Sequence, residues 1–453
     1  LTMKKMKHDV PTRLVKVLIL ILMMVAFGFV WYGYYAARAQ VHYYCRGDWV
    51  VILLFGILYY GFCRSYDAFH ISISPISEII YSQTLALIIS DFIMYVVIWL
   101  LSLYMPNAVP LLITFGVQFL ISVLWTFLAH QWYFHNFRPG RTAVIYDLRE
   151  GMESLVGEYG MEKKFHIEKV LGVEECLAKL SVLDEMDTVF LSGIHSHERN
   201  IILKYCMYQD IQVYVIPRIG DVIMGGAKKV HMFHLPMLRI DRYRPIPEYT
   251  IAKRAFDILF SGIAIVIASP FMLVTAIAIK SDGGPALYKQ KRLTKDGKEF
   301  NVLKFRSMRV DAEKDGVARL STGDKDDRIT PVGKVIRKIR FDELPQLFNI
   351  LRGDMSIVGP RPERPEIARQ YEEEMPEFRL RLQAKAGLTG YAQVYGKYNT
   401  TPYDKLLMDL TYIGTPSLWE DFKICLATVK ILFMPESTEG VAEGATTAMN
   451  GKK

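Results

Sequence analysis

Long apolar stretches dominate the first third of the chain and contain few charged residues. A helix needs about 20 apolar residues to cross a bilayer. Stretches that reach or approach this length lie at about 15–37, 48–63, 79–104 and 108–131. The second is the shortest and contains Gly56 and Gly61, so it fits the pattern least well. We therefore predict a four-span transmembrane domain over residues 1–135.

Charges at the start of the chain set the expected orientation of these spans. Basic residues near the end of a span stay on the cytoplasmic side, and Lys4, Lys5 and Lys7 precede the first span. An even number of spans returns the chain to the cytoplasm near His135. The first apolar run is too long for the core of a cleaved signal peptide, so we expect a true first helix.

Residues 136–245 change from long apolar runs to short strands separated by helical stretches. Strands are predicted at 142–146, 187–191 and 211–216. This alternation is typical of a parallel sheet, so we expect a small Rossmann-like domain. The GxGxxG of a dinucleotide site is missing after the first strand, where Asp147-Leu-Arg-Glu-Gly151 stands. We therefore favour a structural or regulatory domain, followed by a basic, turn-rich linker over 226–252.

One further apolar run covers residues 255–279 and opens a third predicted domain, over 246–435. A fifth span would place the stretch from Leu287 to Arg340, with 16 Lys/Arg against 8 Asp/Glu, on the outside. Such a basic stretch is expected inside. Ser269-Pro270 lies in the middle of the run, where proline removes a backbone hydrogen bond and breaks or kinks a helix. We therefore predict a re-entrant membrane helix that enters and leaves on one side.

The third domain has the mixed pattern of a compact α/β fold and carries several clusters of charged residues. Lys304 and Arg306 stand two apart at a predicted strand, so their side chains can share a face and clamp a diphosphate. The same spacing also fits an ordinary solvated strand edge. Taken alone, this cluster does not separate the two interpretations.

An adjacent pair of carboxylates, Asp342 and Glu343, precedes Pro345, a residue suited to the first turn of a helix. The helix dipole and the nearby Arg337 and Arg340 favour the ionised form of both acids. An ionised carboxylate can act as a nucleophile and as a ligand of a hard cation. An acidic helix start is also common without any catalytic role.

Two glycine-containing segments complete the candidate chemistry. In Gly359-Pro-Arg-Pro362 the prolines fix the backbone and aim Arg361, a residue suited to phosphate recognition. Gly387-Leu-Thr-Gly390 allows a close backbone approach to a ligand. Asp409, further along, could orient a cation or a sugar hydroxyl. A tight turn and a routine acidic helix explain the same residues equally simply.

Taken in order, these pieces resemble the bacterial sugar transferase family, the monotopic phosphoglycosyl transferases. The resemblance covers about 250–433. The matching pieces are Lys253-Arg254 with Asp257, Ser269-Pro270, Lys304-Phe305-Arg306-Ser307-Met308, Asp327-Arg328-Ile329-Thr330, Asp342-Glu343-Leu344-Pro345-Gln346, Met355 to Pro362, and Gly387-Leu388-Thr389-Gly390. The four spans and the Rossmann-like domain resemble the long subgroup that primes capsule or exopolysaccharide synthesis. The chain departs from the family pattern at Thr294, Phe341 and Ala386, which leaves every charged catalytic position in place.

The resemblance implies a reaction in which Asp342 attacks the phosphorus of a UDP-sugar, expels UMP and forms an aspartyl-phosphosugar. Undecaprenyl phosphate then accepts the sugar phosphate. Mg²⁺ would be held by Asp342 and Glu343, and Lys304, Arg306 and Arg361 would bind phosphate. Glu343 would also assist proton transfer or orient the metal. Glucose is weakly favoured over galactose.

The same resemblance places the enzyme in the bacterial cytoplasmic membrane with its catalytic domain facing the cytoplasm. Membrane lipid is then a direct partner, and a homo-oligomer or contact with polysaccharide-assembly proteins is compatible with it. The five cysteines show no ligand spacing and are interpreted as free thiols. Residues 436–453 have the composition of a disordered tail.

Two other classes of function remain open from the sequence. One is a membrane-bound regulator that senses a nucleotide through residues 141–245, although the missing glycine fingerprint counts against it. The other is a lipid- or nucleic-acid-binding protein that uses the basic stretch over 287–340. The second interpretation gives no role to Asp342, Glu343 or the turn around Arg361, so we expect no nucleic-acid partner.

Overall fold

The computed structural model describes residues 2–39, 46–102, 104–149, 151–243, 245–281, 283–310, 328–396 and 400–432. The predicted tail at 436–453 and Asp327 of the family motif lie outside the described residues. The chain divides into two compact units, Leu1–Ile216 and Pro217–Lys453, and each is described by itself.

Four apolar helices begin the first unit: α1 (Thr2–Val30), α2 (Arg46–Ser65), α3 (Ile76–Leu101) and α4 (Val109–Asn136). A π-helical turn at Trp31–Tyr35 prolongs α1. The helices pack against one another as a bundle, in which the rings of Phe27 and Phe55 stack at 4.6 Å. Each helix overlaps one predicted span and is long and apolar enough to cross a membrane. The apolar helices indicate a membrane-associated protein.

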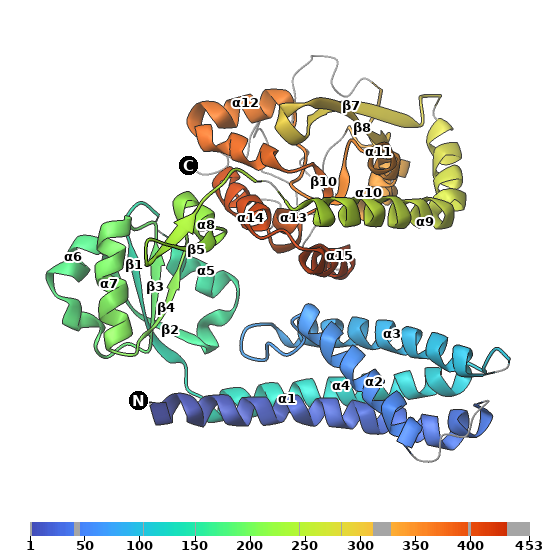
Figure 1. The fold of residues 1–453 in the computed structure, drawn as a ribbon, viewed down its shortest axis with the longest axis horizontal. Helices are drawn as coiled ribbons and strands as arrows, with labels where there is room; N and C mark the ends of the chain where they lie inside the picture. The colour runs from blue at the N-terminus through green and yellow to red at the C-terminus, as the bar shows by residue number, and fades with distance from the viewer. Residues whose placement is uncertain are drawn as a thin grey trace. The chain divides into compact units, whose positions relative to one another are not determined.

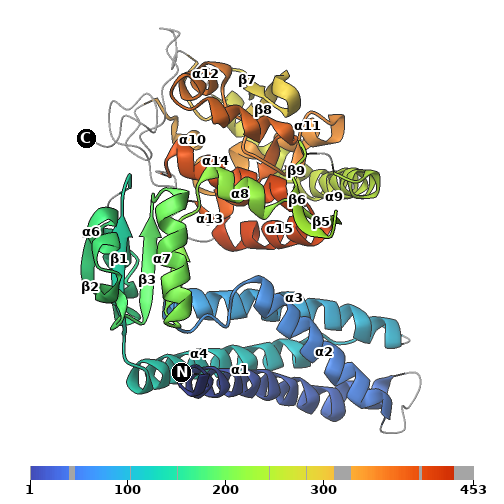
Figure 2. The same cartoon turned by 60° about the vertical axis from the view of Figure 1, so that its left-hand side comes forward.

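A parallel sheet forms the rest of the first unit, in the order β2-β1-β3-β4. Its strands are β1 (Gly140–Tyr146), β2 (Phe165–Gly172), β3 (Thr188–Ser192) and β4 (Gln212–Val215). The helices that connect them are α5 (Met152–Glu158), α6 (Val173–Ala178) and α7 (Ser196–Tyr208). Ile145 and Leu191 pack with α6 and α7 on one face, and Val144 and Phe190 pack with α5 on the other. Figure 2 shows α7 alongside the sheet. The parallel sheet was predicted, but β2 was not.

The second unit begins with α8 (Ile219–Gly225) and an antiparallel hairpin of β5 (Lys228–Met232) and β6 (Leu235–Arg239). We predicted a linker at this position. The turn of the hairpin places Phe233 and His234 in the left-handed region, with φ of 56° and 62°. Two consecutive residues of this kind form the tight turn that matches the twist of a hairpin, and sequence rules assign such turns mainly to Gly, Asn and Asp. The hairpin was therefore hidden from a reading based on turn residues.

Helix α9 (Pro247–Lys280) is the longest element of the second unit and contains Pro270. Pro270 cannot donate to the carbonyl of Val266, and the Ser269 hydroxyl donates to that oxygen instead, at 2.8 Å. Figure 1 shows the ribbon changing direction within this helix, from its olive to its yellow part. The first half is anchored by Arg254, which donates to the carbonyls of Ile350 and Leu351 at 2.6 and 2.7 Å.

The α/β body around α9 contains two small sheets. One is the antiparallel pair β7 (Leu287–Leu293) and β8 (Glu299–Phe305), and the other is the parallel pair β9 (Ser356–Val358) and β10 (Gly387–Thr389). The helices are α10 (Pro331–Lys338), α11 (Gln346–Arg352), α12 (Pro365–Glu374), α13 (Tyr391–Tyr395), α14 (Pro402–Gly414) and α15 (Leu418–Leu432). Asp257 of α9 accepts hydrogen bonds from the Ser356 hydroxyl and the Ile357 amide, at 3.0 and 2.9 Å. The apolar helix is therefore tied to strand β9.

We predict that Gly359→Ala destabilises the second unit, because the backbone after β9 lies too close to the backbone before β10 for a side chain. A Cβ at Gly359 would lie 2.3 Å from the Lys385 carbonyl oxygen, so backbone would have to move. Such overpacking costs about 1–3 kcal/mol. The thermal unfolding midpoint of the purified protein in detergent checks this. Gly220→Ala, in a helix with no atom within 4 Å of the new Cβ, should leave the midpoint unchanged or slightly higher. Equal midpoints for the two variants would contradict the packing argument.

Candidate active site

The Asp342-Glu343 pair lies on a single 3₁₀ turn, Phe341–Glu343, between α10 and α11. Arg340 precedes it in the left-handed region, with φ of 55°, which is uncommon for a residue other than glycine. This conformation ends α10 and turns the chain toward α11, whose N-cap is Pro345. Strained backbone of this kind concentrates at functional sites. The predicted position of the pair, just before a helix, is thus realised with a strained residue in front of it.

Glu343 joins two cations that come from distant parts of the chain. Its Oε1 accepts hydrogen bonds from Lys304 Nζ at 2.8 Å and from Arg361 Nη2 at 3.1 Å. Lys304 belongs to β8, and Arg361 follows β9. The Glu343 side chain is 16% exposed, whereas that of Arg361 is 45% exposed. The structure therefore brings together three of the predicted site residues, with one guanidinium still open to solvent.

The two neighbouring carboxyls have opposite electrostatic environments. Burial alone would raise the pKa of Glu343, but Lys304 and Arg361 outweigh it and hold this pKa well below its ordinary range. Burial raises the pKa of Asp342, and the charge of Glu343 adds to the rise, while Lys304, Arg337 and Arg361 oppose it. Among the described residues, none donates a hydrogen bond to the Asp342 carboxylate. Glu343 is thus held as a charged anchor, whereas Asp342 has no direct hydrogen-bond donor in the part of the chain that the structure describes.

The Asp342-Glu343 pair, called the dyad below, provides oxygen ligands suited to a hard divalent cation. Mg²⁺ is commonly bound by one or two carboxylates, with substrate phosphates and water completing its coordination. Asp342 fits this role because it is half-buried and accepts no hydrogen bond from a described residue. No group of three or more potential metal-binding side chains occurs within the described ranges. Residues Asp342 and Glu343 are therefore compatible with a metal shared with a substrate, rather than with a closed structural site.

The side chain of Arg306 contacts the C-terminal end of α9 instead of Glu343. Strand β8 ends at Phe305, so Arg306 leaves the face that carries Lys304. Its side chain is buried and donates to the carbonyls of Pro285 and Ile279, at 2.8 and 3.1 Å. Guanidinium groups suit the free carbonyls at a helix C-terminus. These contacts give Arg306 a place in joining α9 to β8.

Asp409 is also engaged away from Glu343. It is 1% exposed and forms an ion pair with Arg381 at 2.7 Å. On α14 it stands among the buried residues Leu406, Leu410 and Ile413. The apolar spacing around Asp409 could have indicated that its carboxylate faces the interior of the protein.

Two arginines outside the predicted set of phosphate-binding residues lie near the Asp342-Glu343 pair or near the turn that carries Arg361. Arg340 directly precedes the turn that carries Asp342 and Glu343, and its pKa is lowered by burial, against the charges of these two acids. Burial lowers the pKa of Arg292 to about 10, and its Nη1 donates to the Pro362 carbonyl at 3.1 Å. The Arg337/Arg340 spacing before the dyad was visible in the sequence. Nothing in the spacing of Arg292 indicated its contact with a residue 70 positions away.

Comparisons with known proteins place this site in a family. Residues 248–435 match the family described as bacterial sugar transferase. A UDP-glucose:undecaprenyl-phosphate glucose-1-phosphate transferase of Caulobacter vibrioides is 40% identical over 201 residues, which are 43% of this chain and 74% of that protein. The chain belongs to the bacterial sugar transferase family, which confirms the resemblance seen in its motifs.

Other relatives differ in the sugar that their names specify. A UDP-N-acetylgalactosamine-undecaprenyl-phosphate N-acetylgalactosaminephosphotransferase of Aeromonas hydrophila is 40% identical over 234 residues, covering 51% of this chain and 54% of that protein. An undecaprenyl-phosphate galactose phosphotransferase of Salmonella typhimurium is 38% identical over 236 residues, covering 49% of each chain. The matched region thus spans about half the length of these two relatives.

We predict that Asp342→Asn raises the thermal unfolding midpoint of the metal-free protein at neutral pH. A carboxyl whose pKa is raised by folding opposes the fold once pH exceeds that pKa, and the amide removes this cost. The gain should be about 2–4 °C, the shift that about 1 kcal/mol produces in a unit of this size. The gain should shrink as pH falls toward the ordinary Asp pKa of about 4. The Asp342 carboxyl is then increasingly neutral in both the folded and the unfolded protein.

Unfolding scans from pH 4 to 8 with a chelator measure this effect. The exposed Asp296, whose described ion pair is with the exposed Arg242, provides the matched control. Asp296→Asn should leave the midpoint unchanged at every pH, since exposed ion pairs contribute little. A lower midpoint for Asp342→Asn at pH 7 would contradict the assigned direction of the Asp342 pKa.

Proposed function

We propose that this protein transfers a sugar-1-phosphate from a UDP-sugar to undecaprenyl phosphate, releasing UMP, as the priming step of capsular or exopolysaccharide synthesis. The observation that carries the proposal is the arrangement of Glu343, held by Lys304 and Arg361, beside Asp342. Relatives named for this type of transfer, with glucose, galactose or N-acetylgalactosamine, support it. The comparisons give no support to a nucleotide-sensing regulator.

Asp342 is the proposed nucleophile. Its carboxylate oxygen attacks the phosphorus that carries the sugar, the bond to the UMP oxygen breaks, and an aspartyl-phosphosugar forms. An oxygen of undecaprenyl phosphate then attacks the same phosphorus and releases Asp342. A carboxylate that accepts no described hydrogen bond is well suited to this role, because no existing bond must break before it attacks.

The neighbouring charges have separate tasks in this proposal. Lys304 and Arg361 hold Glu343 and neutralise the diphosphate, which is the main requirement of phosphoryl transfer. The lowered pKa of Glu343 makes it a poor proton donor at neutral pH, so it serves as a fixed negative ligand. Bound Mg²⁺ would supply further charge neutralisation at the phosphates, held by the carboxylates of Asp342 and Glu343.

The re-entrant course of α9 is part of the same proposal. Its first half contacts α11 through Arg254 and β9 through Asp257, within the same unit. Its other end contacts the same unit, since Ile279 packs with Phe305 and Ile336. Two ends attached to one soluble body support a helix that enters and leaves on one side of the membrane. The site then lies at the cytoplasmic surface of the membrane, where the lipid phosphate and a soluble UDP-sugar can meet.

We predict that Asp342→Asn abolishes transfer and the covalent intermediate. Purified protein in lipid nanodiscs would be given Mg²⁺, undecaprenyl phosphate and, in turn, radiolabelled UDP-glucose, UDP-galactose and UDP-N-acetylgalactosamine, with glucose tested first. Wild type should label the lipid, and without lipid it should release one UMP per labelled protein. Loss of the nucleophile should lower the rate by about 10³-fold or more. Asp296→Asn should retain wild-type transfer, and comparable turnover by Asp342→Asn would refute the nucleophile assignment.

We predict that a reporter fused after Lys453 lies in the cytoplasm. A fluorescent protein that folds only in the cytoplasm should be bright there, and alkaline phosphatase, which is active only outside it, should be inactive. The control is the same pair fused after Asn107, in the loop between α3 and α4, which the four-span topology places outside. Active phosphatase at the Lys453 position would show that α9 crosses the membrane.

A further inference from the structure

The turn that carries Arg361 is held by three contacts to consecutive carbonyl groups. The Arg361 carbonyl accepts from Arg381 Nη2 at 2.8 Å, and the Pro362 carbonyl accepts from Arg292 Nη1 at 3.1 Å. The Glu363 carbonyl accepts from the Leu293 amide at 3.0 Å. Pro360 and Pro362 have no N–H groups with which to form a ladder of their own. The turn therefore depends on donors from other elements for its position.

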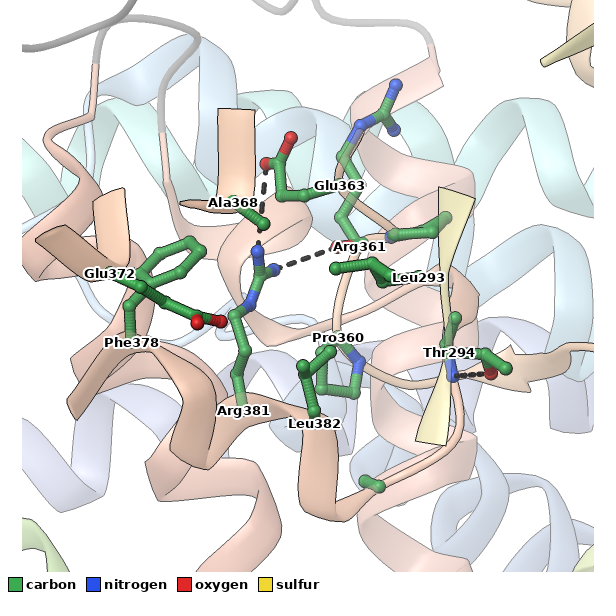
Figure 3. Close-up of a pocket in the computed structure, with 13 residues that line it drawn as sticks. Leu293, Thr294, Pro360, Arg361, Glu363, Ala368, Glu372, Phe378, Arg381 and Leu382 are labelled. Carbon is green, nitrogen blue, oxygen red and sulfur yellow. Dashed lines mark hydrogen bonds and ion pairs between the residues drawn. The ribbon is translucent and has the colours of Figure 1, made fainter. Parts of the chain in front are cut away.

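Arg381 is the most deeply buried of these donors. Its side chain is 3% exposed, and it donates Nε to Asp409 Oδ2 at 2.9 Å. Its Nη1 lies 3.7 Å from Glu363 Oε1, and its guanidinium lies 4.8 Å from the centre of the Phe378 ring. Figure 3 shows the guanidinium directed at Glu363 and at the backbone of Arg361. Each part of this side chain is thus fixed by a neighbour, which leaves it little freedom.

Charges of alternating sign run through this buried region. Arg292 lies 3.8 Å from Glu363, Glu363 lies next to Arg381, and Arg381 pairs with Asp409. A buried guanidinium is costly unless a carboxylate compensates it. Asp409, at 1% exposed, provides that compensation from α14 and cannot reach a ligand from there. Among the described contacts, the one that links the Asp409 carboxylate to the turn is its pair with Arg381.

Arg361 is consequently constrained at two points. Its backbone carbonyl is held by Arg381, and its guanidinium donates to Glu343 of the dyad. We propose that Arg381 and Asp409 are positioning residues that fix Arg361 at the distance from the dyad at which it meets the diphosphate of the UDP-sugar. This inference rests on the proposed function. It replaces a direct substrate contact of Asp409 with an action transmitted through two hydrogen-bonded arginines.

The test is a double-substitution cycle between Arg381 and Arg361. Arg381→Lys keeps the charge beside Asp409 but cannot bond Asp409 and the Arg361 carbonyl with the same planar group. Transfer would be measured for wild type, Arg381→Lys, Arg361→Ala and the double variant, with kcat and KM for the UDP-sugar. Displacing a positioned group by about 1 Å can cost about 100-fold, so Arg381→Lys should lower kcat/KM by about 10- to 100-fold. Arg379→Lys, exposed and two residues away, is the matched control and should change nothing.

The double variant distinguishes a positioning role from a general effect on stability. With the Arg361 guanidinium already removed, Arg381→Lys should lower kcat/KM by no more than about twofold further. Arg381 and Asp409 then have no guanidinium left to position. If Arg381→Lys lowers kcat/KM equally with and without Arg361, the role is general stability and the proposal is overturned. Where Arg381→Lys does not accumulate, Glu363→Gln carries the same cycle, since it leaves the pair of Arg381 and Asp409 in place.

Failure of the proposed function gives a different result. Wild-type protein that neither binds UDP nor transfers sugar phosphate would refute the proposed reaction itself, together with the inference that rests on it. Wild-type protein that transfers sugar phosphate while the cycle is additive would refute only the positioning role. Asp409→Asn should reproduce the loss caused by Arg381→Lys, and full activity of Asp409→Asn would also overturn the inference.

Discussion

Compensation of the negative charge on Asp342 and Glu343 is the constraint on which the second unit depends. Two adjacent, largely buried carboxylates repel each other and would be unstable without nearby cations. The chain supplies them from β8, from the residues before the dyad and from the turn after β9. Glu343 receives the direct hydrogen bonds, so the electrostatic cost is concentrated on Asp342. One unequal distribution of partners thus stabilises Glu343 and leaves Asp342 without a described hydrogen-bond donor.

The apolar helix α9 is connected to the same elements that build the site. Arg254 caps the C-terminus of α11, the helix that follows the dyad, and Asp257 holds β9, the strand that leads to Arg361. Near the change of direction at Pro270, the Phe271 ring lies 6.4 Å from that of Phe341, which precedes Asp342. A change in the position of α9 would therefore act both on the Asp342-Glu343 pair and on the turn that carries Arg361.

The sequence was most informative where local chemistry decides the structure. The parallel sheet, the turn around Arg361 and the helix start after Asp342-Glu343 follow from periodicity, proline and glycine, and all were predicted. The dispositions of Arg306 and Asp409 could not be obtained in this way. Arg306 leaves the face of Lys304 because β8 ends one residue earlier, and Asp409 finds its cation 28 residues away in sequence. Such long-range pairings depend on the assembled fold, which spacing along the chain does not encode.

The described contacts of Asp342 and Glu343, of the cations that hold Glu343 and of Arg381 all lie within the second unit. The family match, over 248–435, falls inside that unit as well. Because the described contacts of the candidate site lie within one unit, the other unit can diverge, lengthen or be exchanged in evolution without disturbing them. Changes in the bundle and in the parallel sheet of the first unit are therefore expected to leave the contacts around Asp342 and Glu343 in place.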